Sequence, residues 1–201
     1  MSLFPTDSAA RRLVLGSTSV YRRELLSRLR LPFSVEPPHV DETPRRGEAP
    51  VALARRLAAA KAQAVAQQHP DAIVIGSDQV ADLDGEPLGK PGNHDNAVAQ
   101  LRRMRGRTVI FQTALSVLCK ETGFAQHDLA PVRVRFRELE DDEIEAYLRA
   151  EQPYDCAGSA KSEGAGIALL EAIESDDPTA LIGLPLIRTC RMLRSAGLRV
   201  F

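Results

Sequence analysis

Residues 72–80 read AIVIGSDQV, and this stretch decides the fold. Its first part, AIVIG, is a short β-branched run typical of a strand buried on both faces of a sheet. Ser77, Asp78 and Gln79 follow at once, and we expect them to lie where that strand ends. Catalytic groups of α/β proteins are commonly carried at strand ends, but an Asp there also often only caps a turn. The position of Asp78 alone therefore does not decide between a catalytic role and a structural role for this residue.

The segments before this stretch alternate strand and helix. Residues 13–15 form an apolar run that stops at the polar turn 16–19, and leucines at helical spacing predict a helix over 21–31. Apolar residues with a period near 3.6 predict a second helix over 50–68, which starts at a proline and carries Lys61 among its alanines.

The segments after it add long strands. A tight turn at 82–86 and a helix over 93–104 precede two β-type segments, 108–119 and 132–139, joined around 120–123. The acidic stretch 138–145 starts another helix, and Asp177 with Pro178 is expected to open a terminal helix that runs to about Ala196. The sum predicts an α/β fold with a mixed sheet.

The composition bounds the class of protein. The chain has 201 residues, a net charge of -1 and 44% hydrophobic residues, which predicts one soluble domain without a uniformly basic surface for nucleic acid. We expect residues 11–201 to fold as one unit behind a loose lead of residues 1–10. The three cysteines form no CxxC pair, and no signal peptide or membrane span is evident, so we expect a cytoplasmic protein.

Charge is unevenly distributed along this nearly neutral chain. Residues 138–151 carry seven acids and one arginine, whereas residues 11–61 carry eleven basic groups and five acids. The chain also has 22 arginines but only four lysines, Lys61, Lys90, Lys120 and Lys161. A compact ammonium is not interchangeable with a planar guanidinium, so these few lysines are of interest.

Three polar segments could form a phosphate site. The turn 16–19 opens a helix, where free backbone N–H groups hold anions, and Arg22 follows one turn later. Lys90 lies between a glycine and a proline, and VDET at 40–43 supplies two carboxylates in a loop. Carboxylates and cations together suit metal-assisted hydrolysis of a phosphoanhydride, although each segment alone is weak evidence. Neither a Walker A loop nor GxGxxG is present.

Taken in order, the motifs resemble one family. They are STSVYRRELL at 17–26, VDET at 40–43, Lys61, GSDQV at 76–80, GKP at 89–91 and CAGSAKSEGAGI at 156–167. This set is similar to the Maf family of nucleotide pyrophosphatases, and the last motif together with Gln79 resembles its 7-methyl-GTP branch. The resemblance implies an elongated α/β domain with a central cleft between two lobes, and hydrolysis of a nucleoside triphosphate to the monophosphate and pyrophosphate.

The resemblance also implies roles for individual residues. Asp78 corresponds to the proton acceptor, and the polar cleft positions are Ser17, Arg22, Glu42, Lys61 and Lys90. From their charges we assign Glu42 and Asp78 to a divalent cation (Mg2+, Mn2+ or Co2+), and Arg22, Lys61 and Lys90 to the triphosphate.

The branch's specificity positions correspond to Tyr21, Gln79 and Glu163. N7-methylation makes guanine positively charged, so an aromatic ring and a carboxylate suit it, because cation–π contact contributes about 0.5 to 2 kcal/mol. The branch often has Trp where this chain has the smaller Tyr21.

Other interpretations stay open. The same residues would serve a pyrophosphatase for dTTP or UTP, and a nucleotide-binding regulator of septum formation would need the cationic cleft without Asp78 as a base. Lys61 could merely extend to water, and Glu163 could be a solvated loop residue. The alternating arginines at 133–137 indicate a solvated sheet face or a partner surface. We expect a small nucleotide as ligand, no nucleic acid or membrane, and a homodimer is compatible with the sequence.

Overall fold

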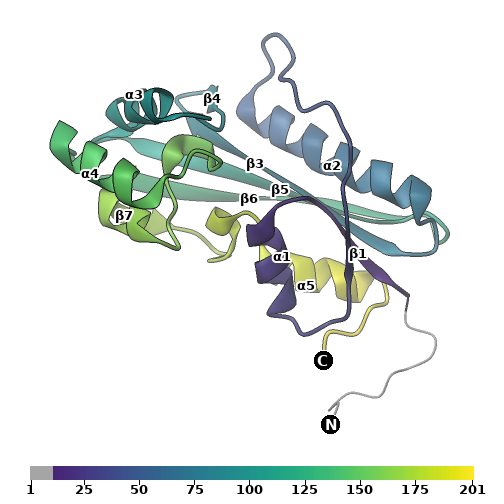
Figure 1. Cartoon of the computed structure of the whole chain (residues 1–201). Helices are drawn as coiled ribbons and strands as arrows, with labels where there is room; N and C mark the ends of the chain where they lie inside the picture. Colours follow the sequence, from purple (N-terminus) through teal and green to yellow (C-terminus); the bar gives the residue numbers. More distant parts are fainter. Residues whose placement is uncertain (1–10) are drawn as a thin grey trace.

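The computed structural model describes residues 11–201, so the expected loose lead of residues 1–10 lies outside the described residues. Strands and helices form one α/β domain with a mixed seven-stranded sheet, which confirms the predicted fold class (Figure 1). The strands are β1 (Leu13–Gly16), β2 (Ser34–Glu36), β3 (Ile73–Leu83), β4 (Glu86–Leu88), β5 (Thr108–Cys119), β6 (Phe124–Phe136) and β7 (Leu170–Glu174). The α-helices are α1 (Val20–Ser27), α2 (Pro50–Gln68), α3 (His94–Met104), α4 (Asp141–Glu151) and α5 (Leu186–Ser195). Short 3-10 turns are η1 (Ala157–Ser159), η2 (Ala165–Leu169) and η3 (Ala180–Ile182).

The sheet has a parallel end and a longer antiparallel part. Its strand order is β2-β1-β3-β5-β6-β7, with β4 paired to the far end of β3. β1 runs parallel to both β2 and β3, whereas β3, β5, β6 and β7 pair antiparallel to one another in turn. Because β3, β5 and β6 are long, the molecule is extended along them, with α3 and α4 at one end and α1, α2 and α5 at the other (Figure 1).

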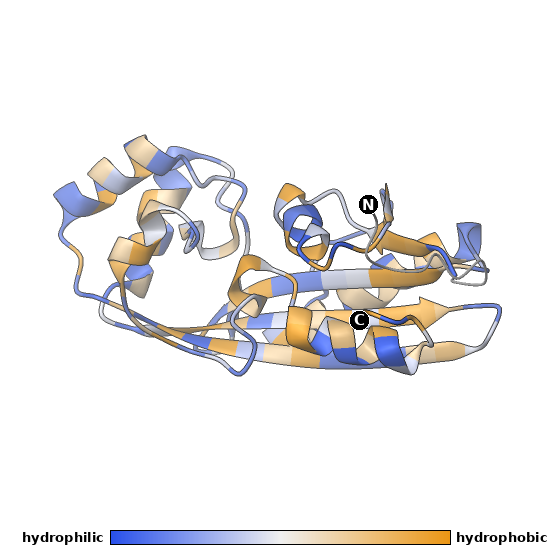
Figure 2. Ribbon diagram, turned by 90° about the horizontal axis from the view of Figure 1, so that it is seen from below, coloured by the Kyte–Doolittle hydropathy of each residue, from blue (hydrophilic) through white to orange (hydrophobic). Residues whose placement is uncertain are grey.

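Two hydrophobic cores lie on one face of β3. Side chains alternate between the two faces of a strand, so residues 73, 75, 81 and 83 share a face. Ile73 and Ile75 belong to the core beneath α1 and α5, whereas Ala81 and Leu83 belong to the core beneath α3 and α4. Figure 2 shows hydrophobic residues along much of the long strands and hydrophilic ones in the loops. Ser77 and Gln79 therefore lie on this face between the two cores.

Helix α2 covers the opposite face and approaches β3 unusually closely. Val74 and Val80 pack against α2 on this face. A Cβ on Gly76 would lie 2.4 Å from the backbone oxygen of Ala58 and 2.5 Å from the backbone nitrogen of Ala62. Only glycine allows this contact without a shift of the helix, and the approach brings α2 alongside residue 78.

The prediction that the strand ends near Gly76, leaving Asp78 after it, is wrong. β3 continues to Leu83, because β5 pairs with it without interruption from residue 74 to residue 82. The polar residues Ser77, Asp78 and Gln79 thus lie inside a strand and point alternately to its two faces.

The start predicted for the terminal helix is also wrong. Gly183 has a φ of 121°, and the residue before Pro185 is disfavoured in helical conformation, so α5 begins only at Leu186. The buried Asp177 still caps this helix from a distance, since its carboxylate accepts the N–H of Arg188 at 3.0 Å. The first helix likewise ends at Ser27 rather than near residue 31.

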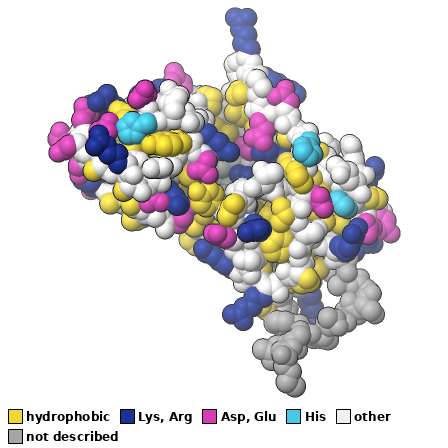
Figure 3. All heavy atoms as spheres, in the orientation of Figure 1, with side chains coloured by type: hydrophobic (Ala, Val, Ile, Leu, Met, Phe, Trp, Pro, Cys, Tyr) yellow, Lys and Arg dark blue, Asp and Glu magenta, His cyan; other side chains and the backbone are white. Residues whose placement is uncertain are grey.

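Several local predictions are confirmed. Asp84 and Gly85 have positive φ in the tight turn before β4, and α4 starts with a capping box of Glu140 and Glu143. Arg133 and Arg135 are exposed on one face of β6. Acidic side chains gather around the α4 end of the molecule (Figure 3). Within residues 11–201, no helix is long and apolar enough to cross a membrane.

Candidate active site

A gap in strand pairing creates an open edge at the middle of β3. The β1 ladder ends where Gly16 pairs with Gly76, and β4 pairs only from Ala81 onward. Within the described residues, positions 77–80 therefore have a strand partner in β5 but none on the opposite edge. Asp78 and Gln79 lie in this gap, so a ligand at the edge can reach side chains from both faces of the sheet.

On the α2 face, two carboxylates converge on one ammonium. Lys61 Nζ lies 2.7 Å from Asp78 Oδ1 and 2.9 Å from Glu42 Oε1. The side chains of Lys61 and Asp78 are 6% and 9% exposed, whereas that of Glu42, on the loop before α2, is 56% exposed. Lys61 thus does not extend to water as an isolated cation. The structure brings together three residues that lie far apart in the sequence.

Burial and charge act in opposite directions on Asp78. Burial raises the pKa of this carboxyl above its ordinary value, while the neighbouring Lys61 and Arg22 oppose the increase. A carboxylate with a raised pKa is a stronger base than an exposed one. Asp78 therefore combines the position and the basicity that a proton acceptor needs.

The turn after β1 brings a second cation to the same edge. Ser19 caps α1 by accepting the N–H of Arg22, and Arg22 Nε donates to the carbonyl of Gly183 at 2.9 Å. Arg22 Nη1 lies 3.5 Å from Ser17 Oγ, a marginal hydrogen bond. Burial lowers the pKa of Arg22, and Asp78 and Glu42 counteract that effect. These interactions place Ser17 and Arg22 beside the carboxylate pair.

Gln79 points to the opposite face from Asp78 and anchors the segment 180–183. Its Nε2 lies 2.9 Å from each of three acceptors: Thr113 Oγ1 and the carbonyls of Ala180 and Leu181. Ser77 Oγ lies 3.0 Å from the carbonyl of Gly183, which also accepts from Arg22. The amide nitrogen of Gln79 is thus engaged in holding a turn.

The remaining specificity candidates are Tyr21, on α1 at one end of the molecule, and Glu163, in the segment after α4 at the other end. Contacts between these two segments bring the candidates near each other. Tyr21 OH lies 3.9 Å from Cys156 Sγ, and Lys161 Nζ lies 5.9 Å from the centre of the Tyr21 ring. Burial and nearby negative groups, Glu163 among them, raise the pKa of Tyr21. Segment 156–163 thus faces the first turn of α1.

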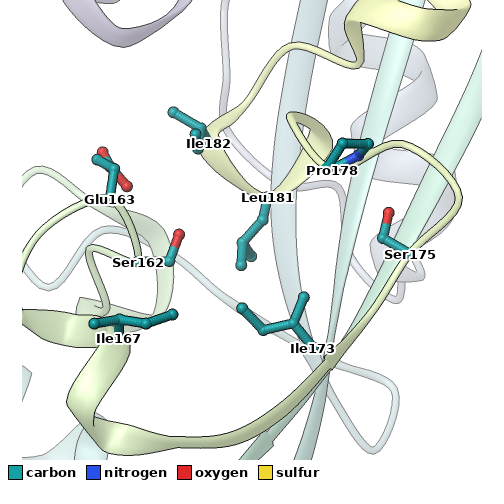
Figure 4. A pocket seen from close by; sticks show the side chains of 8 residues that line it. All are labelled: Ser162, Glu163, Ile167, Ile173, Ser175, Pro178, Leu181 and Ile182. Carbon is teal, nitrogen blue, oxygen red and sulfur yellow. The ribbon is translucent and has the colours of Figure 1, made fainter.

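Glu163 also lines a pocket of about 300 Å³ (Figure 4). Figure 4 shows Glu163 and Ser162 on one side of it and Ile182 and Leu181 on another. Its full lining is Ser162, Glu163, Ile167, Ile173, Ser175, Pro178, Leu181 and Ile182. Because Gln79 holds the backbone of Leu181, two of the three specificity candidates are connected to this pocket.

Lys90 stands apart from this group. It is exposed in the loop before α3, and within residues 11–201 it makes no hydrogen bond or ion pair through its side chain. The loop itself is fixed, since the carbonyl of Pro91 accepts from Asn96 and the N–H of Gly92 donates to Tyr154. The structure therefore does not bring Lys90 into contact with Asp78.

The sequence analysis missed the residues that hold this site together. The carbonyl of Gly183 accepts from Arg22, and the hydroxyl of Thr113 accepts from Gln79. Ser77 donates to the same carbonyl of Gly183, and Glu151 of α4 binds Lys161. No alternation of polar and apolar residues marks this part of β3, because Ser77, Asp78 and Gln79 are three polar residues in a row.

The donor set fits a cation that binds together with substrate. Within the described residues, no group of three or more His, Cys, Asp or Glu side chains is placed to hold a metal ion. Asp78 and Glu42 nonetheless converge on one point, the Lys61 ammonium. Mg2+ is commonly bound by one or two carboxylates, substrate phosphates and waters, which is what these two carboxylates can offer.

Comparison with known proteins agrees with the motifs. The family model described as "Maf-like protein" matches residues 12–196. A protein of Albidiferax ferrireducens named 7-methyl-GTP pyrophosphatase is 70% identical over 97% of this chain and 98% of its own length. Proteins with the same name from Polaromonas sp. and Cupriavidus pinatubonensis are 69% and 60% identical, over 100% and 98% of this chain and 90% and 98% of their own lengths. The chain therefore belongs to the Maf family.

Proposed function

We propose that this chain is a nucleoside triphosphate pyrophosphatase that hydrolyses 7-methyl-GTP. The observation that carries the proposal is the buried Asp78–Lys61 pair, joined by Glu42, at the open edge of β3. The names of relatives at 60% to 70% identity support the substrate. The reaction adds water across the bond between the α- and β-phosphates, so the products are the nucleoside monophosphate and pyrophosphate.

Each residue of the site has a part in this reaction. Asp78 accepts a proton from the attacking water, which its raised pKa favours. Arg22 and Lys61 lie where they offset negative charge on the triphosphate. Glu42 and Asp78 would hold a divalent cation, Mg2+, Mn2+ or Co2+, which when bound polarises phosphate oxygens.

In this proposal the nucleobase binds near Tyr21 and Glu163, on the side of the open edge away from the Asp78–Lys61 pair. Tyr21 offers a ring for stacking, and Glu163 offers a carboxylate to a positively charged base. The pocket lined by Glu163 and Leu181 is mostly apolar and large enough for part of a nucleobase. Lys90 would reach the triphosphate only if its loop approaches the edge when substrate binds.

The location and assembly of the protein follow from the same proposal. We place the enzyme in the cytoplasm, where nucleotides are found, which suits the three free cysteines of the described chain. Its partner is a small nucleotide, and a homodimer stays a prediction.

The replacement Asp78→Asn tests the catalytic assignment. Because general base catalysis contributes about 10²- to 10⁴-fold, we expect kcat/KM for pyrophosphate release to fall at least about 100-fold. Binding of the nucleotide should stay measurable by calorimetry, since Arg22 and Lys61 remain. The matched control is Asp71→Asn, an exposed aspartate just before β3 that should leave turnover unchanged.

The substrate is tested with a panel of 7-methyl-GTP, GTP, dTTP and UTP, each with Mg2+, Mn2+ or Co2+. A preference for UTP or dTTP would contradict the proposed substrate but retain the reaction. Binding without turnover of any nucleotide would favour a regulator, and unchanged turnover in the Asp78 variant would remove that residue from its role.

A further inference from the structure

The last turn of α4 forms a platform for the segment that carries Glu163. Tyr147 and Glu151 are four residues apart and so lie on one face of the helix. Tyr147 OH accepts the N–H of Lys161 at 3.0 Å and donates to the carbonyl of Ser159 at 3.2 Å. Glu151 accepts from Lys161 Nζ at 2.8 Å and from the N–H of Ala165 at 2.9 Å. Two side chains of one helix thus hold both ends of the turn 161–165.

The turn packs closely against this platform and against its own backbone. A Cβ on Gly164 would lie 2.8 Å from the carboxylate oxygens of Glu151. A Cβ on Gly166 would lie 2.6 Å from the carbonyl oxygen of Lys161. The two glycines allow the chain to close around the Lys161–Glu151 pair, so Glu163 has a defined place within the turn.

The single ammonium of this turn, on Lys161, pairs with only one of the two nearby carboxylates. Lys161 and Glu151 form an ion pair with side chains 28% and 17% exposed. Glu163, two residues from Lys161, is exposed and makes no hydrogen bond or ion pair within residues 11–201. Lys161 Nζ lies 5.9 Å from the centre of the Tyr21 ring, so the turn that carries Glu163 lies beside this ring. The contribution of Glu163 to the raised pKa of both Tyr21 and Lys161 agrees with this placement. The ammonium of Lys161 is therefore committed to Glu151 although a second carboxylate is close.

We propose that Glu151 is a positioning residue for base selection, because it binds Lys161 and so leaves Glu163 unpaired beside Tyr21. The inference rests on the proposed function. A positively charged base gains from an unpaired carboxylate next to the aromatic ring, whereas neutral guanine gains little. Without the charge of Glu151, Lys161 would turn to Glu163 and neutralise the group that distinguishes the two bases.

The test compares kcat/KM for 7-methyl-GTP with kcat/KM for GTP in three variants. Glu151→Gln keeps the shape and hydrogen-bonding capacity of the side chain but removes its charge. We expect the ratio to fall about tenfold, as for the loss of one charge next to a partly exposed cation. The double variant Glu151→Gln with Lys161→Met has no ammonium to neutralise Glu163, so its ratio should return to within about twofold of the wild type. The control Glu145→Gln, on the same helix, should leave the ratio unchanged.

The possible outcomes separate this inference from the proposed function. An unchanged ratio in Glu151→Gln, with a wild type that prefers 7-methyl-GTP, overturns the inference alone. A double variant as poor as the single one also overturns it, because the effect would then be structural. A wild type without preference for the methylated base refutes the proposed substrate, and this inference with it.

Discussion

Replacement of Lys61 by methionine tests whether the ion pair at the open edge stabilises the fold and keeps the Asp78 carboxyl ionised. Met fills a similar volume but leaves the Asp78 side chain, which is 9% exposed, without its nearest cation. Removing one partner of a buried pair costs about 3–5 kcal/mol. Glu42 is too exposed to add much to this cost.

Protonation of Asp78 limits the loss, which makes it depend on pH. With an ordinary Asp pKa near 3.8, neutralising the carboxyl costs about 4 kcal/mol at pH 7 but only about 1.6 kcal/mol at pH 5. A folded-state pKa raised above the unfolded value gives stability that is complete below the unfolded pKa and is lost as pH rises through the folded pKa. In the variant this pKa is raised further, so the gap to the wild type should widen from pH 5 to pH 7.5.

The measurement is the free energy of unfolding from urea titrations at both pH values, together with thermal midpoints. A loss of about 3–4 kcal/mol lowers the midpoint by roughly 6–16 °C for a domain of this size. Lys120→Met is the matched control, since Lys120 is exposed in the turn between β5 and β6 and should lose almost nothing. Equal losses in the two variants, or a loss independent of pH, would refute the buried pair.

Two further predictions concern the geometry of the site and its cation. Gly76→Ala should lower the free energy of unfolding by about 1–3 kcal/mol or more and reduce turnover, because the new Cβ pushes α2, and with it Lys61, away from β3. Gly89→Ala, whose Cβ would meet nothing within 4 Å, controls for stability, and an equally stable Gly76 variant would contradict the close packing. Removal of divalent cations with EDTA should lower pyrophosphate release at least about 100-fold, and added Mg2+, Mn2+ or Co2+ should restore it. Full turnover in EDTA would remove Glu42 and Asp78 from their role as metal ligands.

Local patterns alone predicted much of this chain. Periodicity located α2 and its Lys61, turn residues located the hairpin at 84–85, and the acidic run located the start of α4. These features depend on neighbours in the sequence, through helix periodicity, positive φ and the helix dipole. The motifs also placed the chain in its family before any coordinates.

Tertiary structure decided how the candidate residues relate to one another. Whether Asp78 ends a strand or lies within one depended on β5, where its partner Ala114 is 36 residues away in the sequence, and this pairing put Asp78 and Gln79 on opposite faces. The Asp78–Lys61–Glu42 contact depended on the close approach of α2 at Gly76. Glu151 and the carbonyl of Gly183 were invisible in the sequence, because a hydrogen bond across 10 or 161 residues leaves no local pattern. The sequence by itself thus determined the elements and the family, whereas the pairing of charges required the packing of distant segments.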